Sequence, residues 1–228
     1  MKVQLEPLIS ELQADSNISF HFTQGSNPVN MPRQFEGFTG PPPNFTFIEC
    51  DLEANARIMS AIDARGDPED TMRIWQASPG SYGGRDITPV LSRLLEQIDQ
   101  DNDIEGIIGY SEGAGVAASL IVEESKRMEL FGRIPRLKSA IFIAGLPPMD
   151  SGTGRFLLRD EVGYLIKIPT CHIVGTQDTM ICGAMALYNV CDCDTADLFD
   201  HGGGHSIPRD SQTLKELATT IQSMIASV

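Results

Sequence analysis

Residues 104–115 read IEGIIGYSEGAG: an apolar run enters the pattern Gly109-x-Ser111-x-Gly113 and continues into small, helix-forming residues. A buried strand that turns through G-x-S-x-G into a helix is typical of a nucleophile elbow, which presents its serine on a strained turn at the edge of a sheet. We expect glycine at 109 and 113 because a Cβ at either position would clash with neighbouring chain. The pattern also occurs by chance in structural turns, but its place between a strand and a helix favours Ser111 as a nucleophile.

Apolar runs of strand length alternate with amphipathic runs of helix length along the chain. The expected strands are Ile18–Thr23, Ile104–Tyr110, Ser139–Gly145, Thr170–Gly175 and Ala196–His201. The expected helices are Val3–Ala14, Asp86–Asp99, Glu112–Leu130 and Asp210–Ile225. The middle three strands are nearly continuous in apolar residues, as strands buried on both faces of a parallel sheet are. The alternation predicts a single α/β domain over residues 1–228, with a mostly parallel sheet flanked by helices.

The amino-acid composition limits the classes of partner that the chain can bind. The chain has 31 acidic against 17 basic residues and a net charge of −14, which argues against nucleic acid or a membrane as a partner. Its opening residues lack the apolar run of a secretory signal, and no stretch reaches the length of a membrane span. The five cysteines are irregularly spaced, and Cys191-x-Cys193 lacks a second pair at zinc spacing. We expect a cytoplasmic protein with reduced thiols, no metal and no cofactor.

A serine nucleophile needs a base within hydrogen-bonding distance, and His205 is the best placed of the four histidines. His21 and His172 lie inside expected strands, where a hydrogen-bonded core histidine is the better interpretation, and His201 ends the last strand. His205 lies in DHGGGHSIP (200–208), a glycine-rich loop that can carry an imidazole over the elbow. Its HGGG is similar to an oxyanion motif of lipases, but that motif precedes the nucleophile in the chain.

The base in turn needs a carboxylate to fix its tautomer and to stabilise its charged form. Asp178 follows the strand TCHIV directly, in Gly175-Thr-Gln-Asp178. The order Ser111, Asp178, His205 is that of α/β-hydrolases. The other carboxylates have less suitable positions, in a long loop or without a strand before them: Asp150, Asp160, Asp192, Asp194 and Asp197.

Two long stretches interrupt the alternation, Gly25–Asn44 and Pro147–Glu161. Loops of this length in a compact domain are usually functional, so we expect them to form the walls of a mostly apolar substrate pocket above the elbow. Surface packing is the other interpretation. The expected wall residues are Phe35, Phe38, Phe45, Met149 and Phe156, with Tyr110 and Glu112 at the floor.

The chain resembles the FSH serine-hydrolase family, a short α/β-hydrolase branch with little or no cap, from about Gln4 to its C-terminus. The resemblance is carried by GYSEGAGVAASLIVEE, AIFIAGLPPM, IPTCHIVGTQD, GAMALYNVCD and FDHGGGHSIPRD, and is strongest to members from fungal polyketide gene clusters. It implies an esterase or thioesterase that needs no cofactor. The implied substrate is a polyketide or other acyl chain, either free or bound to a carrier protein, which the enzyme releases or trims.

Members of the family begin with a strand and a Leu-His-Gly-type loop whose backbone N–H forms half of the oxyanion hole. This sequence instead enters the following helix at Met1-Lys2-Val3, which leaves the Glu112 N–H as the expected donor. The strand Ile104–Tyr110 is apolar and is expected to pair on both edges. Its second partner would then be Ile18–Thr23, or a second copy of the chain in a homodimer.

Two alternatives to hydrolysis stay open from the sequence. A pocket that keeps the three residues but lacks the full oxyanion hole can guide the cyclisation or dehydration of a polyketide without hydrolysing it. The second alternative is a catalytically silent partner of a polyketide synthase. Reaction of Ser111 with a fluorophosphonate separates the hydrolase hypothesis from both alternatives.

Overall fold

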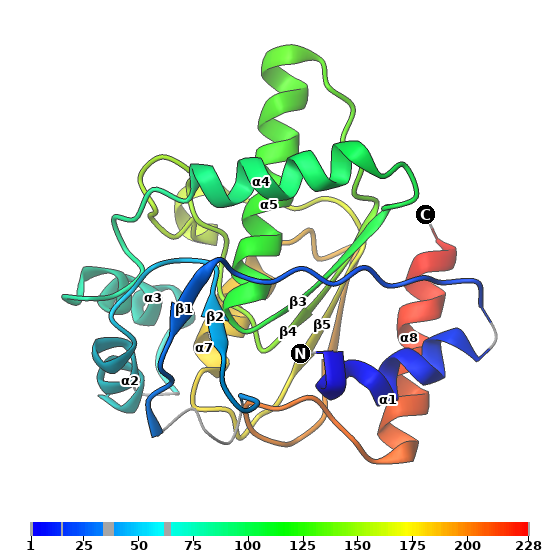
Figure 1. Ribbon diagram of the computed structural model, residues 1–228, viewed down its shortest axis with the longest axis horizontal. Coiled ribbons are helices and arrows are strands. Elements are labelled where there is room, and N and C mark those ends of the chain that lie inside the picture. Colours follow the sequence, from blue (N-terminus) through cyan, green and yellow to red (C-terminus); the bar gives the residue numbers. More distant parts are fainter. Residues whose placement is uncertain (1, 15, 34–38, 62–64, 228) are drawn as a thin grey trace.

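The computed structural model describes residues 2–14, 16–33, 39–61, 65–227. Its main sheet is made of four parallel strands in the order β3-β4-β5-β6 (Figure 1). The strands are β3 (Gly106–Tyr110), β4 (Ser139–Ile143), β5 (Thr170–Val174) and β6 (Ala196–Asp200). They match four of the five expected strands. Because all four run parallel, their carboxyl ends meet at one edge, where parallel α/β sheets place their ligands.

The faces of the sheet are covered by two sets of helices. On β4, Ile141 and Ile143 pack with one cluster and Ala140 and Phe142 with the other, as period-two alternation requires. The first cluster contains α1 (Lys2–Gln13) and α8 (Ser211–Ala226); the second contains α3 (Pro68–Ala77), α4 (Thr88–Gln100), α5 (Glu112–Phe131) and α7 (Ile181–Asn189). The predicted α/β architecture, a parallel sheet between helices, is confirmed.

The smaller elements were not expected from the sequence. The remaining helices are α2 (Leu52–Ala61) and the short α6 (Arg159–Val162). Strands β1 (Asn27–Val29) and β2 (Asn44–Thr46) form a separate antiparallel ribbon. The expected loop Gly25–Asn44 therefore contains one strand and the first residue of another.

The expected strand at Ile18–Thr23 is wrong. Its alternating Ile18, Phe20 and Phe22 are typical of a half-buried strand, but the segment pairs with no strand of the described chain. Phe20 packs against the α1/α8 cluster, whereas Phe22 is exposed and lies beneath the ammonium group of Lys2. The pairing of β3 on both edges within one chain is also wrong, because β3 pairs only with β4 among the described residues.

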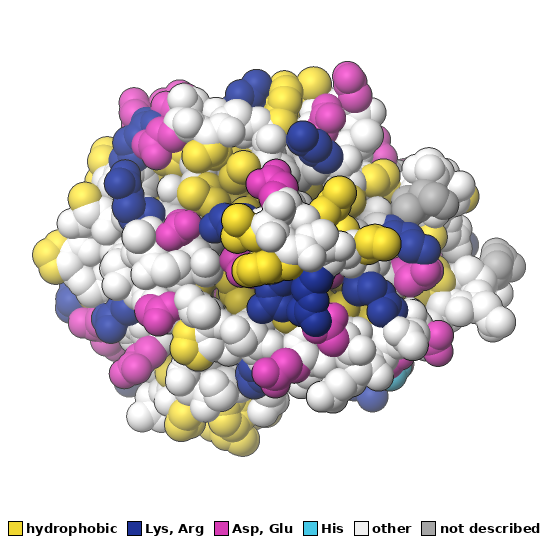
Figure 2. All heavy atoms as spheres, turned by 90° about the horizontal axis from the view of Figure 1, so that it is seen from above, with side chains coloured by type: hydrophobic (Ala, Val, Ile, Leu, Met, Phe, Trp, Pro, Cys, Tyr) yellow, Lys and Arg dark blue, Asp and Glu magenta, His cyan; other side chains and the backbone are white. Residues whose placement is uncertain are grey.

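Helix α5 projects beyond the body of the molecule at its C-terminal end (Figure 1). This end exposes four large apolar side chains, Met128, Leu130, Phe131 and Ile134. Figure 2 looks onto it and shows hydrophobic side chains beside Lys and Arg side chains. The helix has 20 residues, so this end lies about 30 Å along the helix from Ser111. No helix of the described chain combines the length and apolar character needed to cross a bilayer.

Candidate active site

Ser111 lies on the tight turn between β3 and α5. Its backbone has φ 54° and ψ −121°, in the left-handed half of φ space that non-glycine residues seldom adopt. The turn is held because the Ser111 N–H donates to the Ile143 carbonyl at 2.9 Å and the Ala114 N–H donates to the Ser111 carbonyl at 3.0 Å. This is the strained elbow that the sequence predicts.

The two glycines of the elbow differ in which atoms an added Cβ would meet. A Cβ at Gly109 would lie 2.4 Å from the Cα of Ala114, so the strand and helix could not approach as they do. A Cβ at Gly113 would meet only the Cε2 atom of Phe47, at 3.9 Å, which is an ordinary contact. The expected clash is therefore present at 109 and absent at 113.

Ser111, His205 and Asp178 form a continuous line of hydrogen bonds. The Nε2 atom of His205 lies 3.0 Å from the Ser111 Oγ, and its Nδ1 atom lies 2.8 Å from Asp178 Oδ2. Asp178 is 3% exposed and His205 7% exposed, so water screens their interaction only weakly. With Nδ1–H donating to the carboxylate, Nε2 is left free to accept the serine proton.

The loops that follow β5 and β6 hold Asp178 and His205 in place. Asp178 begins a tight turn: its N–H donates to the Gly175 carbonyl at 2.9 Å, and its Oδ1 accepts the Met180 N–H at 2.8 Å. The Gln177 N–H donates to the carbonyl of Gly203 at 2.9 Å, which joins the two loops directly. A Cβ at Gly175 would lie 2.2 Å from that carbonyl oxygen, so this close approach requires glycine at 175.

Tyr110, expected at the pocket floor, supports the histidine loop. Its hydroxyl donates to the backbone carbonyl of His205 at 3.0 Å, and the two rings lie 5.4 Å apart at 36°. Burial raises the pKa of the Tyr110 hydroxyl, so it stays a donor at neutral pH. The sequence gives no signal for this contact, because the partners are 95 residues apart.

Glu112 is the first residue of α5, where backbone N–H groups lack helical partners. Its N–H therefore has the position expected of an oxyanion donor. Its carboxyl group has a separate partner: it accepts the N–H groups of Phe47 at 3.1 Å and Ile48 at 3.0 Å. Burial raises the Glu112 pKa to about 7, while the two hydrogen bonds oppose this rise.

Two of the predicted wall residues, Met149 and Phe156, lie in the core instead of lining a pocket. Met149 and Phe156 are 2% and 3% exposed and belong to the hydrophobic core, where they face each other in an isolated bridge. Their assignment to a pocket is wrong, because an apolar side chain in a long loop packs inward as readily as toward a ligand. Phe45 lies half-buried in β2, opposite Pro28. Phe35 and Phe38 lie outside the described residues.

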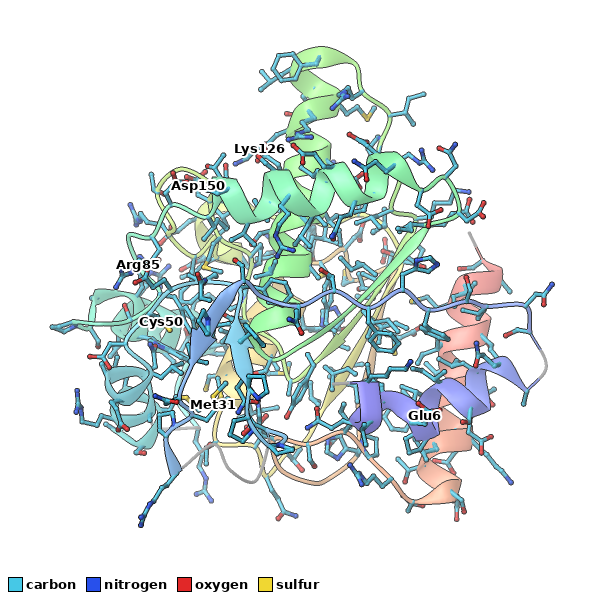
Figure 3. The ribbon with its side chains drawn as sticks, viewed as in Figure 1. Glu6, Met31, Cys50, Arg85, Lys126 and Asp150 are labelled. Carbon is cyan, nitrogen blue, oxygen red and sulfur yellow. The ribbon has the colours of Figure 1, made fainter. Side chains whose placement is uncertain are left out.

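The second expected wall, Pro147–Glu161, runs away from the elbow. Asp150 pairs with Lys126 at 3.1 Å (Figure 3), and Lys126 lies 14 residues after Glu112 on α5, about 21 Å along the helix. Only the start of the stretch approaches the elbow, where a Cβ at Gly115 would lie 3.6 Å from the Pro147 carbonyl oxygen.

The other three histidines lie in different environments. His172 is the hydrogen-bonded core histidine that we expected: it is 1% exposed, contacts Thr170 Oγ1 at 3.1 Å, and burial lowers its pKa to about 3. His21 is exposed, 3.7 Å from Asp101, so its expected core position is wrong. Burial also lowers the pKa of His201, whose Nδ1 accepts the Gly203 N–H and thereby shapes the glycine turn before His205.

One group of described residues has the arrangement to bind a cation: Asp192, Cys193 and Asp194, whose ligand atoms lie within 4.8 Å of one another. They follow α7 on an exposed turn, and Cys193 also contacts the Tyr164 hydroxyl. All five cysteines are free thiols.

Residues 3–217 match the model of the serine hydrolase (FSH1) family. The chain belongs to this family. Among curated relatives, esterase FPY3 of Fusarium mangiferae is 29% identical over 151 residues, 63% of this chain and 67% of that protein. Hydrolase phiM of Talaromyces stipitatus is 26% identical over 69% of this chain and 65% of its own length. Family of serine hydrolases 2 of Saccharomyces cerevisiae is 28% identical over 71% of this chain and 73% of that protein. The matches thus span about two thirds to three quarters of these relatives.

Proposed function

We propose that this FSH1-family protein hydrolyses an acyl ester or thioester with Ser111 as nucleophile, His205 as general base and Asp178 as the residue that orients the base. The observation that carries the proposal is the line of hydrogen bonds from Ser111 Oγ through His205 to Asp178, built on a strained turn. A serine hydroxyl without a base is a weak nucleophile, and this geometry supplies one at 3.0 Å.

The chemistry follows from the positions of the atoms. His205 Nε2 takes the Ser111 proton as Oγ attacks the acyl carbonyl carbon. The Glu112 N–H donates a hydrogen bond to the carbonyl oxygen, on which negative charge develops. His205 then gives the proton to the departing alcohol or thiol, which leaves an acyl ester on Ser111. Water attacks that ester with the same base, releases the carboxylic acid and restores the serine.

We propose further that the acyl group is a polyketide or a related chain of secondary metabolism. The resemblance to family members from fungal polyketide clusters supports this substrate class. The relatives' descriptions as esterase and hydrolase support acyl hydrolysis. The chain's net charge of −14 suits a neutral acyl chain better than an anionic polymer.

A panel of acyl thioesters and aryl esters of increasing chain length tests the proposal. We expect release of the acid by the wild-type protein and its loss in Ser111→Ala, which removes only a hydroxyl from the turn. Hydrolysis that survives in Ser111→Ala would disprove the serine mechanism. Conversion of a polyketide to a cyclised or dehydrated product by both proteins, without acid release, would favour the non-hydrolytic alternative.

A further inference from the structure

The Glu112 side chain makes a contact that the hydrolytic mechanism does not use. Its carboxyl group accepts two consecutive backbone N–H groups, those of Phe47 and Ile48, from a segment 64–65 residues earlier in the chain. The backbone of Phe47 is held from its other side as well, because Asn27 Nδ2 donates to the Phe47 carbonyl at 3.0 Å. The segment after β2 is thus tied both to the ribbon and to the residue beside the nucleophile.

The Phe47 ring lies next to the elbow. Its Cε2 atom would lie 3.9 Å from a Cβ at Gly113, so ring and turn are neighbours. Phe47 is only partly buried, and it packs against the main core. An aromatic ring at this place is suited to contact the apolar part of an acyl group.

We propose that Glu112 is a positioning residue: its carboxyl group holds the backbone of Phe47 and Ile48 against the nucleophile turn and so fixes the Phe47 ring as a wall of the acyl site. The acyl group in this inference depends on the proposed function, whereas the contact between Glu112 and the Phe47–Ile48 backbone does not. The Glu112 backbone N–H and side chain then serve the reaction separately, one toward the oxyanion and one toward the pocket.

The contact responds to pH. Cys50 and Tyr82 interact electrostatically with the Glu112 carboxyl, and Arg85 and Asp51 in turn act on Cys50. Burial raises the Cys50 pKa to about 11 and the Tyr82 pKa above its ordinary value, so both stay neutral near pH 7. Figure 3 shows Cys50 and Arg85 on the same side of the molecule as β1 and β2. Of Glu112, Cys50 and Tyr82, Glu112 therefore changes charge near neutrality.

The charged carboxylate accepts both N–H groups more strongly than the neutral acid does, since hydrogen bonds to an ionised acceptor are about twice as strong. The contact therefore tightens as pH rises through about 7. Glu112→Gln stays neutral and offers one acceptor oxygen, so it resembles the wild type below pH 7 and differs from it above. We expect the ratio of wild-type to Glu112→Gln kcat/KM to rise with pH through 7.

Stability is expected to change in the opposite direction. The Glu112 pKa is about 7 in the folded protein against an ordinary 4.5, so folding takes up a proton between these pH values. The free energy of unfolding of the wild type, relative to Glu112→Gln, therefore falls as pH rises from 4.5 to 7. Opposite trends in activity ratio and melting temperature separate positioning from a merely structural role, which would move both together.

The experiment has two arms. In the first, hydrogen exchange of the peptide that contains Phe47 and Ile48 is followed in the wild type, Glu112→Ala and the control Glu129→Gln, an exposed glutamate on the same helix. Because Glu112→Ala removes a buried hydrogen-bond partner, we expect exchange at these amides to be faster by about tenfold or more in this variant. In the control, exchange should be unchanged. Unchanged protection in Glu112→Ala overturns the proposal, whether or not the protein hydrolyses an ester. Should Glu112→Ala not fold, Glu112→Gln, which keeps one acceptor, replaces it.

In the second arm, kcat/KM for a long acyl ester is measured in a double-mutant cycle with Phe47→Ala. We expect Glu112→Ala to lower kcat/KM about tenfold in the wild type and less than about twofold in the Phe47→Ala background, because coupled residues are not additive. Equal factors in the two backgrounds overturn the proposal. Absence of any Ser111-dependent hydrolysis overturns the proposed function instead, and the exchange arm still decides the contact.

Discussion

Replacing Asp178 by asparagine tests how the carboxylate controls the imidazole. In the wild type, Oδ1 accepts the Met180 N–H and Oδ2 accepts from His205 Nδ1, both at 2.8 Å. Asparagine offers one oxygen and one NH₂ group for these two places. If its oxygen keeps the Met180 contact, the NH₂ group faces Nδ1, which must then be the acceptor. The His205 proton moves to Nε2, and the base can no longer take the Ser111 proton.

The size of the activity loss depends on how often the amide adopts the opposite orientation. That orientation keeps the productive His205 tautomer but points the NH₂ group at the Met180 N–H. Leaving a buried donor unpaired costs about 1–3 kcal/mol, which lowers the population of the productive orientation by about 5- to 150-fold. The neutral amide also gives up the charge that stabilises the imidazolium. Together these terms give an expected loss in kcat of about 10²–10⁴, toward the value known for the same change in a serine protease.

The assay is steady-state hydrolysis of the best ester of the panel, with the melting temperature measured in parallel. Asp160→Asn and Asp194→Asn serve as controls, since both carboxylates are exposed on the surface. We expect the two controls to stay within about threefold of the wild type, as surface substitutions do. Activity of Asp178→Asn within tenfold of the wild type, or greater sensitivity at either control, would refute the reasoning.

Two further changes test the support of His205. Tyr110→Phe removes the donor to the His205 carbonyl, so kcat/KM should fall by about three- to tenfold, the contribution of one hydrogen bond. Tyr164→Phe is the control. An unchanged kcat/KM in Tyr110→Phe would show that the His205 loop does not need this hydrogen bond. Gly175→Ala places a Cβ 2.2 Å from the Gly203 carbonyl oxygen, so the free energy of unfolding in urea should fall by about 1–3 kcal/mol, with loss of activity. Gly40→Ala, where a Cβ meets nothing within 4 Å, should do neither, and equal effects at 175 and 40 would contradict the close approach.

Local features of the sequence predict the elbow and the buried strands well. The elbow needs only a strand, a turn and a helix that are contiguous in the chain, and β4 and β5 are apolar on both faces because helices cover both. Asp178 and His205 are located by the same logic, since each follows a strand of the sheet within a few residues. A usable signal was missed at α3, where Asp67 caps the helix and Pro68 occupies its first turn.

Features that depend on distant partners could not be predicted. The alternation of Ile18, Phe20 and Phe22 satisfies the pattern of a strand, yet strand formation also requires a neighbour, which sequence periodicity does not report. The positions of Met149 and Phe156 in a long loop favour a pocket, yet both side chains pack in the core. The Glu112 contact joins residues more than 60 positions apart through backbone N–H groups, which leave no trace in side-chain identity.

Covalent labelling of Ser111 tests the central claim most directly. The folded protein is incubated with an alkyl fluorophosphonate, its intact mass is measured, and the modified residue is located by peptide mapping. The account predicts one adduct, on Ser111, which forms rapidly in the wild type, slowly in Asp178→Asn and not at all in Ser111→Ala. An adduct on another residue, or a wild-type protein that stays unmodified while folded, would contradict it.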